Sequence, residues 1–548
     1  MEIREQLALF EYAGRHQEET NSGALKTKQR RFGAYYTPRS ATDVMAKWVM
    51  RHDGETVLEP SFGDGAFIRA LSRATVSAGF RDLRVLGVEL DEGASLKLGK
   101  VADGLVLDTI RGDFLQTDSG SVDGVIGNPP YVRLRHLEAD SRAHALHVAQ
   151  QALGHKMATS GSLWMPFVLH AMENLKPGGR LALVLPYEFT YVKYALPLWR
   201  KLARSFRFLA VDRSRERLFS DVMQEVVILY ADGYGGTTDT VHFRAFETVA
   251  DLIASQPVIE RDLPIRAILD GDRVFVRALL SDTLLRLLDH LLPVRTQRME
   301  SLATIRIGYV SGDKGFFHPD PGTVRDYALR PVSLVEAITS TKSLASAGVY
   351  SSTVPPGKVS RLFLPQAGLT PSEAAYVEYG ESLGVQRRYK CRIRSPWYLV
   401  PGVRTPDLIL SVFSERPLVL LNDAAFAASN SLICGYTKPG VDSEALVAAW
   451  YTSLTLLQCE IEVHALGGGV MVLIPGEANK IRLPYSVQVD EQHLAKLNGL
   501  LLATETAKAY MAGDAAVLQE QLGLTSSDIE CIREGIEVLA AWRTAHRS

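Results

Sequence analysis

Cysteine is scarce in this sequence. The 548 residues include four cysteines, and these are widely separated: Cys391, Cys434, Cys459 and Cys531. A disulfide framework and a structural zinc site both require cysteines at short, regular spacings, so the sequence predicts neither. Scattered reduced thiols are typical of a cytoplasmic protein.

Long apolar runs and an excess of either charge are lacking as well. No stretch approaches eighteen consecutive apolar residues, so no transmembrane helix is expected. The first twenty residues carry charged side chains at both ends and are therefore unlike a secretory signal. The formal net charge is -2, which excludes a uniformly basic nucleic-acid-binding protein but not a local basic face.

What the sequence does contain, from about residue 34 to residue 235, is an alternation of short apolar runs with helical patterns. This alternation predicts an α/β domain with a mostly parallel sheet. We expect helices over residues 65–78 and 163–176. We expect strands over residues 56–60, 84–90, 121–128, 180–186, 208–213 and 225–232.

The pattern changes after about residue 235. Strand-like fragments and glycine-rich turns become frequent, and the apolar periodicity predicts helices over residues 277–294, 491–510 and 527–543. We therefore predict three parts: an amino-terminal arm (1–33), an α/β domain (34–265) and a mixed α+β domain (266–548).

The first predicted strand ends in a glycine-containing turn that carries Glu59, Pro60, Gly63 and Gly65. Glycine allows the backbone to approach a ligand at the carboxyl end of a strand, which is the usual binding position in open α/β sheets. The turn lacks the third glycine of a dinucleotide fingerprint, so a plain tight turn is the alternative.

Acidic residues follow the next strands in order. Glu89 ends the second predicted strand, where its carboxylate would accept hydrogen bonds from both hydroxyls of a ribose. Asp113 and Phe114 come next and suit the amino group and the face of an adenine. A capping carboxylate and a core phenylalanine would explain each residue alone, but their order favours a nucleoside cofactor. Upstream, Thr37 precedes Pro38 and suits either a cofactor carboxylate or, as we expect, a helix cap.

The tetrapeptide Asn128-Pro129-Pro130-Tyr131 follows the strand predicted at 121–128. Two consecutive prolines stop a strand and stiffen the loop. The Asn128 side-chain oxygen and the Pro129 carbonyl are two fixed acceptors, which suit the two hydrogens of an exocyclic amine whose lone pair is delocalised into a ring. Tyr131 offers a ring on which a planar base would stack. An Asn-Pro turn with a surface tyrosine is the plainer alternative.

In this order, the motifs resemble those of the amino-group DNA methyltransferases, specifically the adenine-N6 enzymes of the gamma order, which are TaqI-methyltransferase-like. The resemblance spans residues 30–235 and implies a Rossmann-like S-adenosylmethionine-dependent methyltransferase domain followed by a target-recognition domain. It implies no metal. It implies that S-adenosylmethionine is contacted by Thr37, Glu59, Pro60, Gly63, Gly65, Glu89, Asp113 and Phe114. It implies that a flipped adenine is held by Asn128, Pro129, Pro130 and Tyr131, with Phe219 stacking on its other face.

A basic stretch in the carboxyl half, residues 386–404, contains no acidic residue and interleaves its cations with Tyr389, Trp397 and Tyr398. Such a composition predicts a surface that contacts DNA phosphates, with a solvated strand as the alternative. The residues that we expect to contact DNA are Arg387, Arg388, Lys390, Arg392, Arg394, Trp397 and Arg404.

The tetrapeptide leaves the substrate open, because a planar glutamine amide of a protein, or an RNA base, poses the same electronic problem as adenine. The long carboxyl part and its basic stretch favour double-stranded DNA, with the chain as the modification component of a restriction-modification or related defence system. About 33 residues precede the Thr-Pro segment, so we expect no nuclease domain in this chain and leave a separate endonuclease as a partner. A DNA-binding module without activity is a further alternative, against which the intact tetrapeptide speaks.

Overall fold

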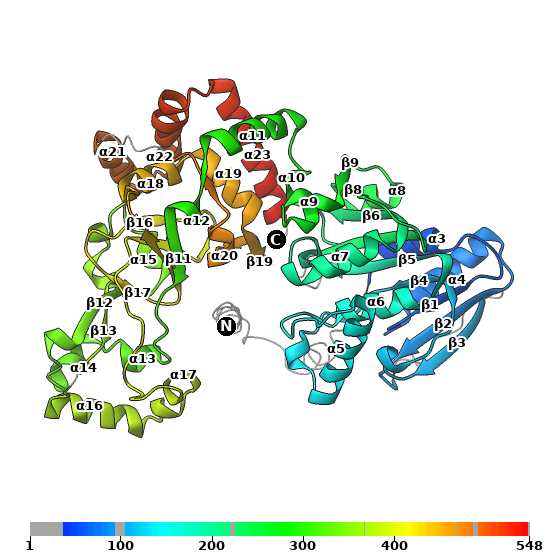
Figure 1. The fold of residues 1–548 in the computed structure, drawn as a ribbon, viewed down its shortest axis with the longest axis horizontal. Coiled ribbons are helices and arrows are strands. Elements are labelled where there is room, and N and C mark those ends of the chain that lie inside the picture. The colour runs from blue at the N-terminus through cyan, green and yellow to red at the C-terminus, as the bar shows by residue number, and fades with distance from the viewer. Residues whose placement is uncertain are drawn as a thin grey trace. The chain divides into compact units, whose positions relative to one another are not determined.

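The computed structural model describes residues 37–93, 105–219, 225–365, 368–466, 468–485 and 491–545. The predicted amino-terminal arm, residues 1–33, lies outside these ranges. The chain forms two compact units, and the division between them falls at Leu279 and Leu280 (Figure 1). We had placed the boundary near residue 265, which is the first residue of a helix that packs within unit 1.

Unit 1 is built on a nine-stranded sheet with the order β3-β2-β1-β4-β5-β7-β6-β8-β9. The pairs β1–β2, β2–β3, β1–β4, β4–β5 and β6–β8 are parallel, and the pairs that involve β7 or β9 are antiparallel. The strands are β1 (Thr56–Glu59), β2 (Leu83–Glu89), β3 (Leu105–Arg111), β4 (Val122–Gly127), β5 (Leu175–Pro186), β6 (Phe206–Ser214), β7 (Val226–Tyr234), β8 (Thr240–Phe246) and β9 (Ile259–Pro264). The predicted α/β fold with a mostly parallel sheet is confirmed.

Helices cover this sheet because the central strands are apolar on both faces. Every residue of β5 from Leu181 to Leu185 is fully buried, whichever face it points to. One apolar core joins α3 and α4 to β1, β2, β4, β5 and β7, while α6 packs on β5 and α7 on β6. The helices of unit 1 are α3 (Arg39–Val49), α4 (Ala66–Ala78), α5 (Ala139–Leu153), α6 (Trp164–Glu173), α7 (Leu196–Ala203), α8 (Val249–Ala254), α9 (Ile265–Leu269) and α10 (Val274–Arg277).

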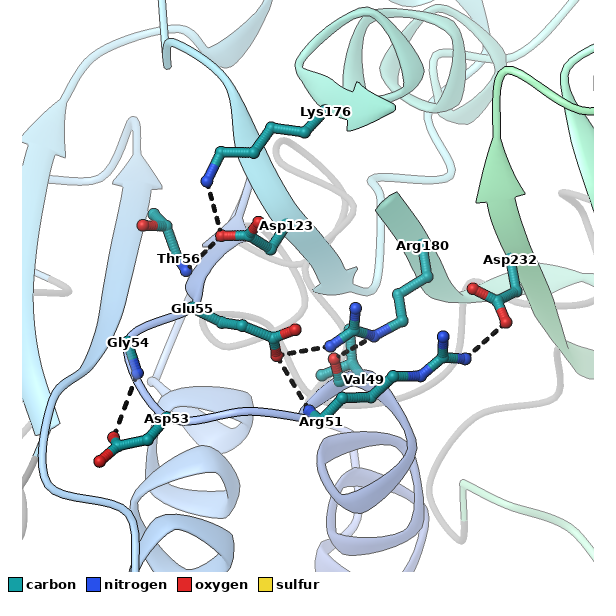
Figure 2. Close-up of polar contacts among 10 residues, drawn as sticks. All are labelled: Val49, Arg51, Asp53, Gly54, Glu55, Thr56, Asp123, Lys176, Arg180 and Asp232. Atoms are coloured by element: carbon teal, nitrogen blue, oxygen red, sulfur yellow. Dashed lines mark hydrogen bonds and ion pairs between the residues drawn. The ribbon is translucent and has the colours of Figure 1, made fainter. Parts of the chain in front are cut away.

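A polar cluster closes the amino edge of the sheet (Figure 2). The buried Arg180 of β5 donates to Glu55, just before β1, at 2.5 Å and to the carbonyl of Val49 at 2.6 Å. Asp123, at the start of β4, accepts from Lys176 at 2.8 Å and from the Thr56 amide at 2.8 Å. These charges tie the starts of β1, β4 and β5 together and leave the carboxyl edge to other groups.

Unit 2 contains several small sheets rather than one large one. The largest has the order β11-β18-β14-β16 and is antiparallel. Its strands and those of the smaller sheets are β10 (Gln297–Arg298), β11 (Ala303–Ile307), β12 (Leu334–Ile338), β13 (Ser360–Phe363), β14 (Leu408–Ser411), β15 (Phe413–Ser414), β16 (Val419–Leu421), β17 (Ala427–Ala428), β18 (Leu432–Thr437), β19 (His464–Leu466), β20 (Val470–Val472) and β21 (Arg482–Leu483). The mixed α+β composition expected for this half is what the structure has.

The helices of unit 2 are α11 (Asp282–Arg295), α12 (Met299–Leu302), α13 (Lys314–Phe317), α14 (Pro321–Asp326), α15 (Thr341–Leu344), α16 (Pro371–Ser382), α17 (Tyr389–Arg392), α18 (Ser443–Trp450), α19 (Ser453–Glu462), α20 (Pro475–Ala478), α21 (Glu491–Leu502), α22 (Thr506–Gly513) and α23 (Ser526–Thr544). The three helices that periodicity predicted in unit 2 are present as α11, as α21 with α22, and as α23, because the segment 491–510 is divided into two helices. Within the described ranges, no helix has the length and apolarity needed to cross a bilayer.

Candidate active site

The turn after β1 has a backbone that only glycine adopts easily. Gly63 and Gly65 both have positive φ, +53° and +80°, and Gly65 is the residue from which α4 begins. A side chain added at Gly63 would meet no atom within 4 Å, so open space lies beside this backbone. A turn of this shape lets a ligand approach the carboxyl end of β1, and the predicted cofactor contact of these glycines stays a prediction.

Glu89, at the end of β2, is fixed against this turn. Its Oε2 accepts a 2.8 Å hydrogen bond from the Gly63 amide, and its Oε1 accepts from the amides of Leu90 and Asp91, both at 2.8 Å. These bonds hold the carboxylate at the sheet edge in one orientation. Each oxygen has further lone-pair capacity, because a carboxylate accepts about four hydrogen bonds in total.

Glu59, at the end of β1, is a buried carboxyl group beside the same turn. It is 1% exposed, and neither oxygen has a hydrogen bond of normal geometry to another described residue. Burial raises the pKa of Glu59 well above its ordinary value, and the neighbouring charges of Asp64 and Glu89 raise it further. A buried acceptor without a donor is costly, and a cationic ligand group would supply both the charge and the hydrogens that it lacks.

Asp113 and Phe114 follow β3 in a short helical turn. The Asp113 carboxylate accepts from the Leu115 amide at 3.1 Å, so it caps this turn. The Phe114 side chain is 2% exposed and packs against the rings of Phe167 and His170, whose centroids lie 5.3 and 4.7 Å away. Asp113 is therefore a capping carboxylate and Phe114 a core residue. Their contacts with an adenine stay a prediction.

Asn128 begins the loop after β4 and is held by the two segments that the sequence singled out beside it. Its Nδ2 donates to Oγ1 of Thr37 at 3.2 Å, and its backbone carbonyl accepts from Oγ of Ser61 at 3.3 Å. Gly127 keeps the ends of β1 and β4 close, since a Cβ there would lie 3.2 Å from Pro60 Cδ. The Thr-Pro segment, the glycine turn and the tetrapeptide thus meet at one place.

One expectation for Thr37 is wrong. We expected its hydroxyl to cap the following helix, but α3 starts after Pro38, which occupies the cap position, and no side chain caps it. The Thr37 hydroxyl instead accepts the hydrogen bond from Asn128, and Thr37 is 7% exposed. Proline at the cap leaves the threonine one residue too far upstream to reach the first helical amides.

Tyr131 and Phe219 lie at the same apolar core. The Tyr131 hydroxyl donates to the carbonyl of Val184 in β5 at 3.1 Å, and its half-buried ring packs against the core that contains Phe219. Phe219 is 5% exposed and directly precedes residues 220–224, which lie outside the described ranges. The structure therefore brings both predicted base-stacking residues to one side of the sheet.

A charged network behind the tetrapeptide was missed by sequence reasoning. Arg133 donates to Glu188 at 2.8 Å and to the Tyr194 hydroxyl at 3.4 Å, and that hydroxyl donates to Glu188 at 2.7 Å. The amide of Leu163 also bonds the Val132 carbonyl at 2.8 Å. The loop is thereby anchored on the segments after β5 and before α6. Pairings between residues about sixty positions apart leave no local signal that the sequence could have offered.

The basic stretch of unit 2 divides into residues that face outward and residues that face inward. Arg394 donates to the carbonyls of Val310 and Ser311, and the indole of Trp397 donates to Glu381 at 3.0 Å. Trp397 also packs on Phe316, with ring centroids 5.1 Å apart. The side chains that are exposed are Arg387, Arg388, Arg392 and Arg404, and Lys390 is half-buried.

Two family profiles match the chain. One, described as the C-terminal domain of the Type II methyltransferase M.Eco57I, matches residues 272–518. The other, described as N-6 DNA Methylase, matches residues 21–193, which include the glycine turn and the Asn128 loop. Together the two matches indicate an N6-adenine DNA methyltransferase.

Relatives of this methyltransferase include the Type II methyltransferase M.AccI of Acinetobacter calcoaceticus, which is 23% identical over 82% of this chain and 85% of its own length. The Type II methyltransferase M.PaeR7I of Pseudomonas aeruginosa is 25% identical over 67% of this chain and 68% of its own length. The Type II methyltransferase M.TthHB8I of Thermus thermophilus is 30% identical over 29% of this chain and 35% of its own length. These matches favour DNA over the protein and RNA alternatives that the tetrapeptide left open.

Among solved structures, the Type IIL restriction-modification enzyme MmeI in complex with DNA is similar in fold to the methyltransferase. The TM-score is 0.53 at 13% identity, and the similarity covers 91% of this chain and 75% of that one. DNA methyltransferases use S-adenosylmethionine, which carries an ammonium group. The buried Glu59 carboxyl group, which lacks a hydrogen bond of normal geometry, lies beside the open glycine turn and fits such a group. Within the described ranges, no group of three or more His, Cys, Asp or Glu side chains is placed to hold a metal ion.

Proposed function

We propose that the chain transfers a methyl group from S-adenosylmethionine to the N6 amine of an adenine that is rotated out of duplex DNA, with Asn128 as the residue that activates the amine. The observation that carries this proposal is the position of Asn128, which is hydrogen-bonded to Thr37 and to Ser61 of the glycine turn at the carboxyl edge of the sheet. That edge is where open α/β sheets bind their ligands.

The cofactor is proposed to occupy the glycine turn. When bound, S-adenosylmethionine supplies an electrophilic methyl group on a sulfonium sulfur. Glu59 would neutralise its ammonium, because this carboxyl group is buried without a donor. The Glu89 carboxylate, oriented by three backbone amides, would accept the ribose hydroxyls. The remaining cofactor contacts that we propose are Pro60, Gly63, Gly65, Asp113 and Phe114.

The tetrapeptide is proposed to act on the amine. The Asn128 Oδ1 and the Pro129 carbonyl accept its two hydrogens, which favours a tetrahedral nitrogen with its lone pair available. Pro129 and Pro130 keep this acceptor pair stiff, so little reorganisation is needed. Tyr131 and Phe219 hold the base by stacking. The amine proton leaves after the nitrogen has become cationic, so no strong base is required at this position.

An adenine within the duplex hides its amine, so the nucleotide must leave the stack at a cost of a few kcal/mol. Contacts with DNA phosphates from unit 2 offset part of this cost. We assign them to the cations Arg387, Lys390, Arg392 and Arg404, since Arg388, Arg394 and Trp397 are engaged within unit 2. In the cell we propose a modification role within a restriction-modification system, with cleavage left to a separate endonuclease.

Two variants test the proposal. Asn128→Ala is expected to bind S-adenosylhomocysteine with unchanged affinity in calorimetry while transfer of a labelled methyl group to duplex DNA is lost. Asn174→Ala is the matched control, because Asn174 is an asparagine of unit 1 whose side chain donates to the His170 carbonyl and whose backbone carbonyl accepts from the amide of Val122, at the amino end of β4. It should keep methyl transfer.

The same assay separates the alternative substrates. Duplex DNA, RNA and a glutamine-containing peptide are offered to the wild-type chain, and sequencing then locates N6-methyladenine in the DNA. Label that appears in RNA or peptide but not in DNA would contradict the proposed substrate. Methyl transfer that survives in Asn128→Ala would contradict the proposed mechanism.

A further inference from the structure

The short helix α17 and the residues that flank it have an inner and an outer face. The inner face carries residues 388, 391 and 394, and the outer face carries residues 389, 392 and 393, as the helical repeat requires. Cys391 is fully buried in an apolar core of unit 2. Arg388 forms an ion pair with the buried Asp313, and Arg394 donates to the Ser311 carbonyl at 2.8 Å. The segment is therefore anchored on the loop at residues 310–313.

The outer face is unusual for its exposed apolar area. Tyr389 is 60% exposed and Ile393 is 57% exposed, and they stand on either side of Arg392, which is exposed as well. Of the three aromatic residues in the basic stretch, Trp397 and Tyr398 pack against the core. Tyr389 alone of the three is exposed, and the Lys390 ammonium lies 5.6 Å from the centroid of its ring.

The charge of the segment itself indicates what this face binds. No aspartate or glutamate occurs from residue 382 to residue 406, while arginines and lysine are frequent. Among the described residues, the side chains of Arg387 and Arg392 have no ion-pair or hydrogen-bond partner. Cations suit a polyanion, and an aromatic ring and a branched aliphatic side chain between them suit the faces and edges of bases.

We infer that Tyr389 and Ile393 are base-contacting residues, with the Tyr389 ring stacked on a DNA base and Ile393 packed beside it, while Arg387 and Arg392 contact the flanking phosphates. Rotating a nucleotide out of a duplex interrupts the stack, and proteins that distort DNA use apolar side chains at such interruptions. The anchoring by Cys391, Arg388 and Arg394 holds the outer face in place, so little ordering is needed on binding. This inference rests on the proposed function, because it takes duplex DNA as the ligand.

The salt dependence of DNA binding distinguishes base contacts from phosphate contacts. Each phosphate contact adds about one unit to the slope of log affinity against log salt, whereas stacking adds nothing to it. The probe is a fluorescent duplex that contains the sequence methylated by the wild-type chain, titrated by anisotropy at several salt concentrations. Tyr389→Ala should weaken binding about 5- to 150-fold with an unchanged slope. Arg392→Ala should reduce the slope by about 1.

Two further variants control for the fold and for general apolar exposure. Tyr389→Phe keeps the ring and should bind like the wild type. Ile393→Ala should weaken binding by about 3-fold or more, whereas Val332→Ala should not, although Val332 is a branched residue of unit 2 with 58% exposure. Far-ultraviolet circular dichroism should be the same for all variants, since each replaces an exposed side chain.

Three results would overturn the inference. Wild-type affinity in Tyr389→Ala would do so, as would a loss of affinity that comes with a reduced slope, which would make Tyr389 part of the phosphate contact. A change in oligomeric state with unchanged DNA affinity would assign the surface to self-association. If the wild-type chain neither binds nor methylates duplex DNA, the proposed function fails instead, and that result is seen before any variant is made.

Discussion

At the scale of single residues, the side-chain amide of Asn128 has two chemically different ends, and only its oxygen accepts hydrogen bonds. Thr37 accepts from the nitrogen end at 3.2 Å. The oxygen end is thereby kept as the acceptor that the proposed reaction needs. Thr37 would then be a positioning residue, a role that differs from the cofactor contact that the family resemblance implied.

Replacing the hydroxyl tests this role. Thr37→Val keeps the shape of the side chain but removes the acceptor, so we expect single-turnover methyl transfer to fall about 2- to 12-fold, the kinetic equivalent of one ordinary hydrogen bond. Thr37→Ser restores the acceptor and should restore the rate. The affinity for S-adenosylhomocysteine should stay the same in both variants. A weaker affinity with an unchanged rate of the saturated complex would instead assign Thr37 to the cofactor.

At the scale of elements, one buried glutamate lies just before β1 and another ends it. Their pKa values are shifted in opposite directions. Burial and the nearby charges of Asp64 and Glu89 raise the pKa of Glu59, and the Ile68 amide and the Arg69 charge offset only part of this rise. Burial would also raise the pKa of Glu55, but hydrogen bonds from Arg180 and from the Arg51 amide outweigh it and lower the pKa below its ordinary value. The Glu55 carboxylate therefore stabilises the fold at the start of β1, whereas burying the charge of Glu59 is unfavourable at the end beside the glycine turn.

The two pKa shifts therefore make the free energy of unfolding depend on pH in opposite directions. In an unfolded chain a glutamate has a pKa of about 4.3. A raised pKa means that the folded state binds more protons above that pH, so Glu59 reduces stability as pH rises. A lowered pKa means the reverse, so the contribution of Glu55 is fully present above about 4.3 and is lost as pH falls through its lower, folded value.

Thermal unfolding of two isosteric variants measures both effects. At pH 7.5, Glu59→Gln should raise the stability of unit 1 by about 1 kcal/mol while weakening S-adenosylhomocysteine binding, because Gln carries no charge to bury or to offer. Glu55→Gln should lower stability by about 1–3 kcal/mol, and the loss should shrink as the pH falls below about 4.3. A stabilising Glu55→Gln, or a destabilising Glu59→Gln, would contradict the opposite shifts.

Apolar runs located most strands of the sheet. Strands β1, β2, β4, β6 and β7 lie within two residues of their predicted ends. Strands β3, β8 and β9 were not expected, because exposed or half-buried positions interrupt the apolar residues in each of them. In β9 only Leu263 is buried, and an edge strand with one solvated face has no such apolar run.

The parts of the site that could be predicted are those that local sequence motifs mark. The glycine turn, Glu89 and the Asn128 tetrapeptide lie at the ends of neighbouring parallel strands, and strand order in sequence therefore brings them to one edge. The hydrogen bond from Asn128 to Thr37 and the inward turn of Arg394 depend on partners about 80–90 residues away. Composition cannot show which arginine of a basic stretch faces solvent.

At the scale of the whole molecule, each unit has its own buried core, and each core contains a buried glutamate that is paired with an arginine. In unit 1, Arg180 pairs with Glu55 at 2.5 Å. In unit 2, Glu373, which is fully buried, accepts from Arg330 at 2.9 and 2.7 Å and from Ser333 at 2.5 Å. These bonds lower the pKa of Glu373 to about 2 against the effect of burial. Removing Arg180 leaves the buried Glu55 without its cationic partner and costs about 3–5 kcal/mol.

This division predicts how the cofactor product stabilises the chain. All of the proposed cofactor contacts belong to unit 1, so S-adenosylhomocysteine at 100 times its Kd should stabilise that unit by about 2.7 kcal/mol and leave unit 2 unchanged. Calorimetry should show two unfolding transitions, of which only one moves with ligand. Arg180→Met should lower the transition that the ligand raises, and Arg330→Met should lower the other. A single transition that shifts as a whole in all three experiments would mean that the two units unfold as one cooperative body, because each perturbation would then be felt by both cores.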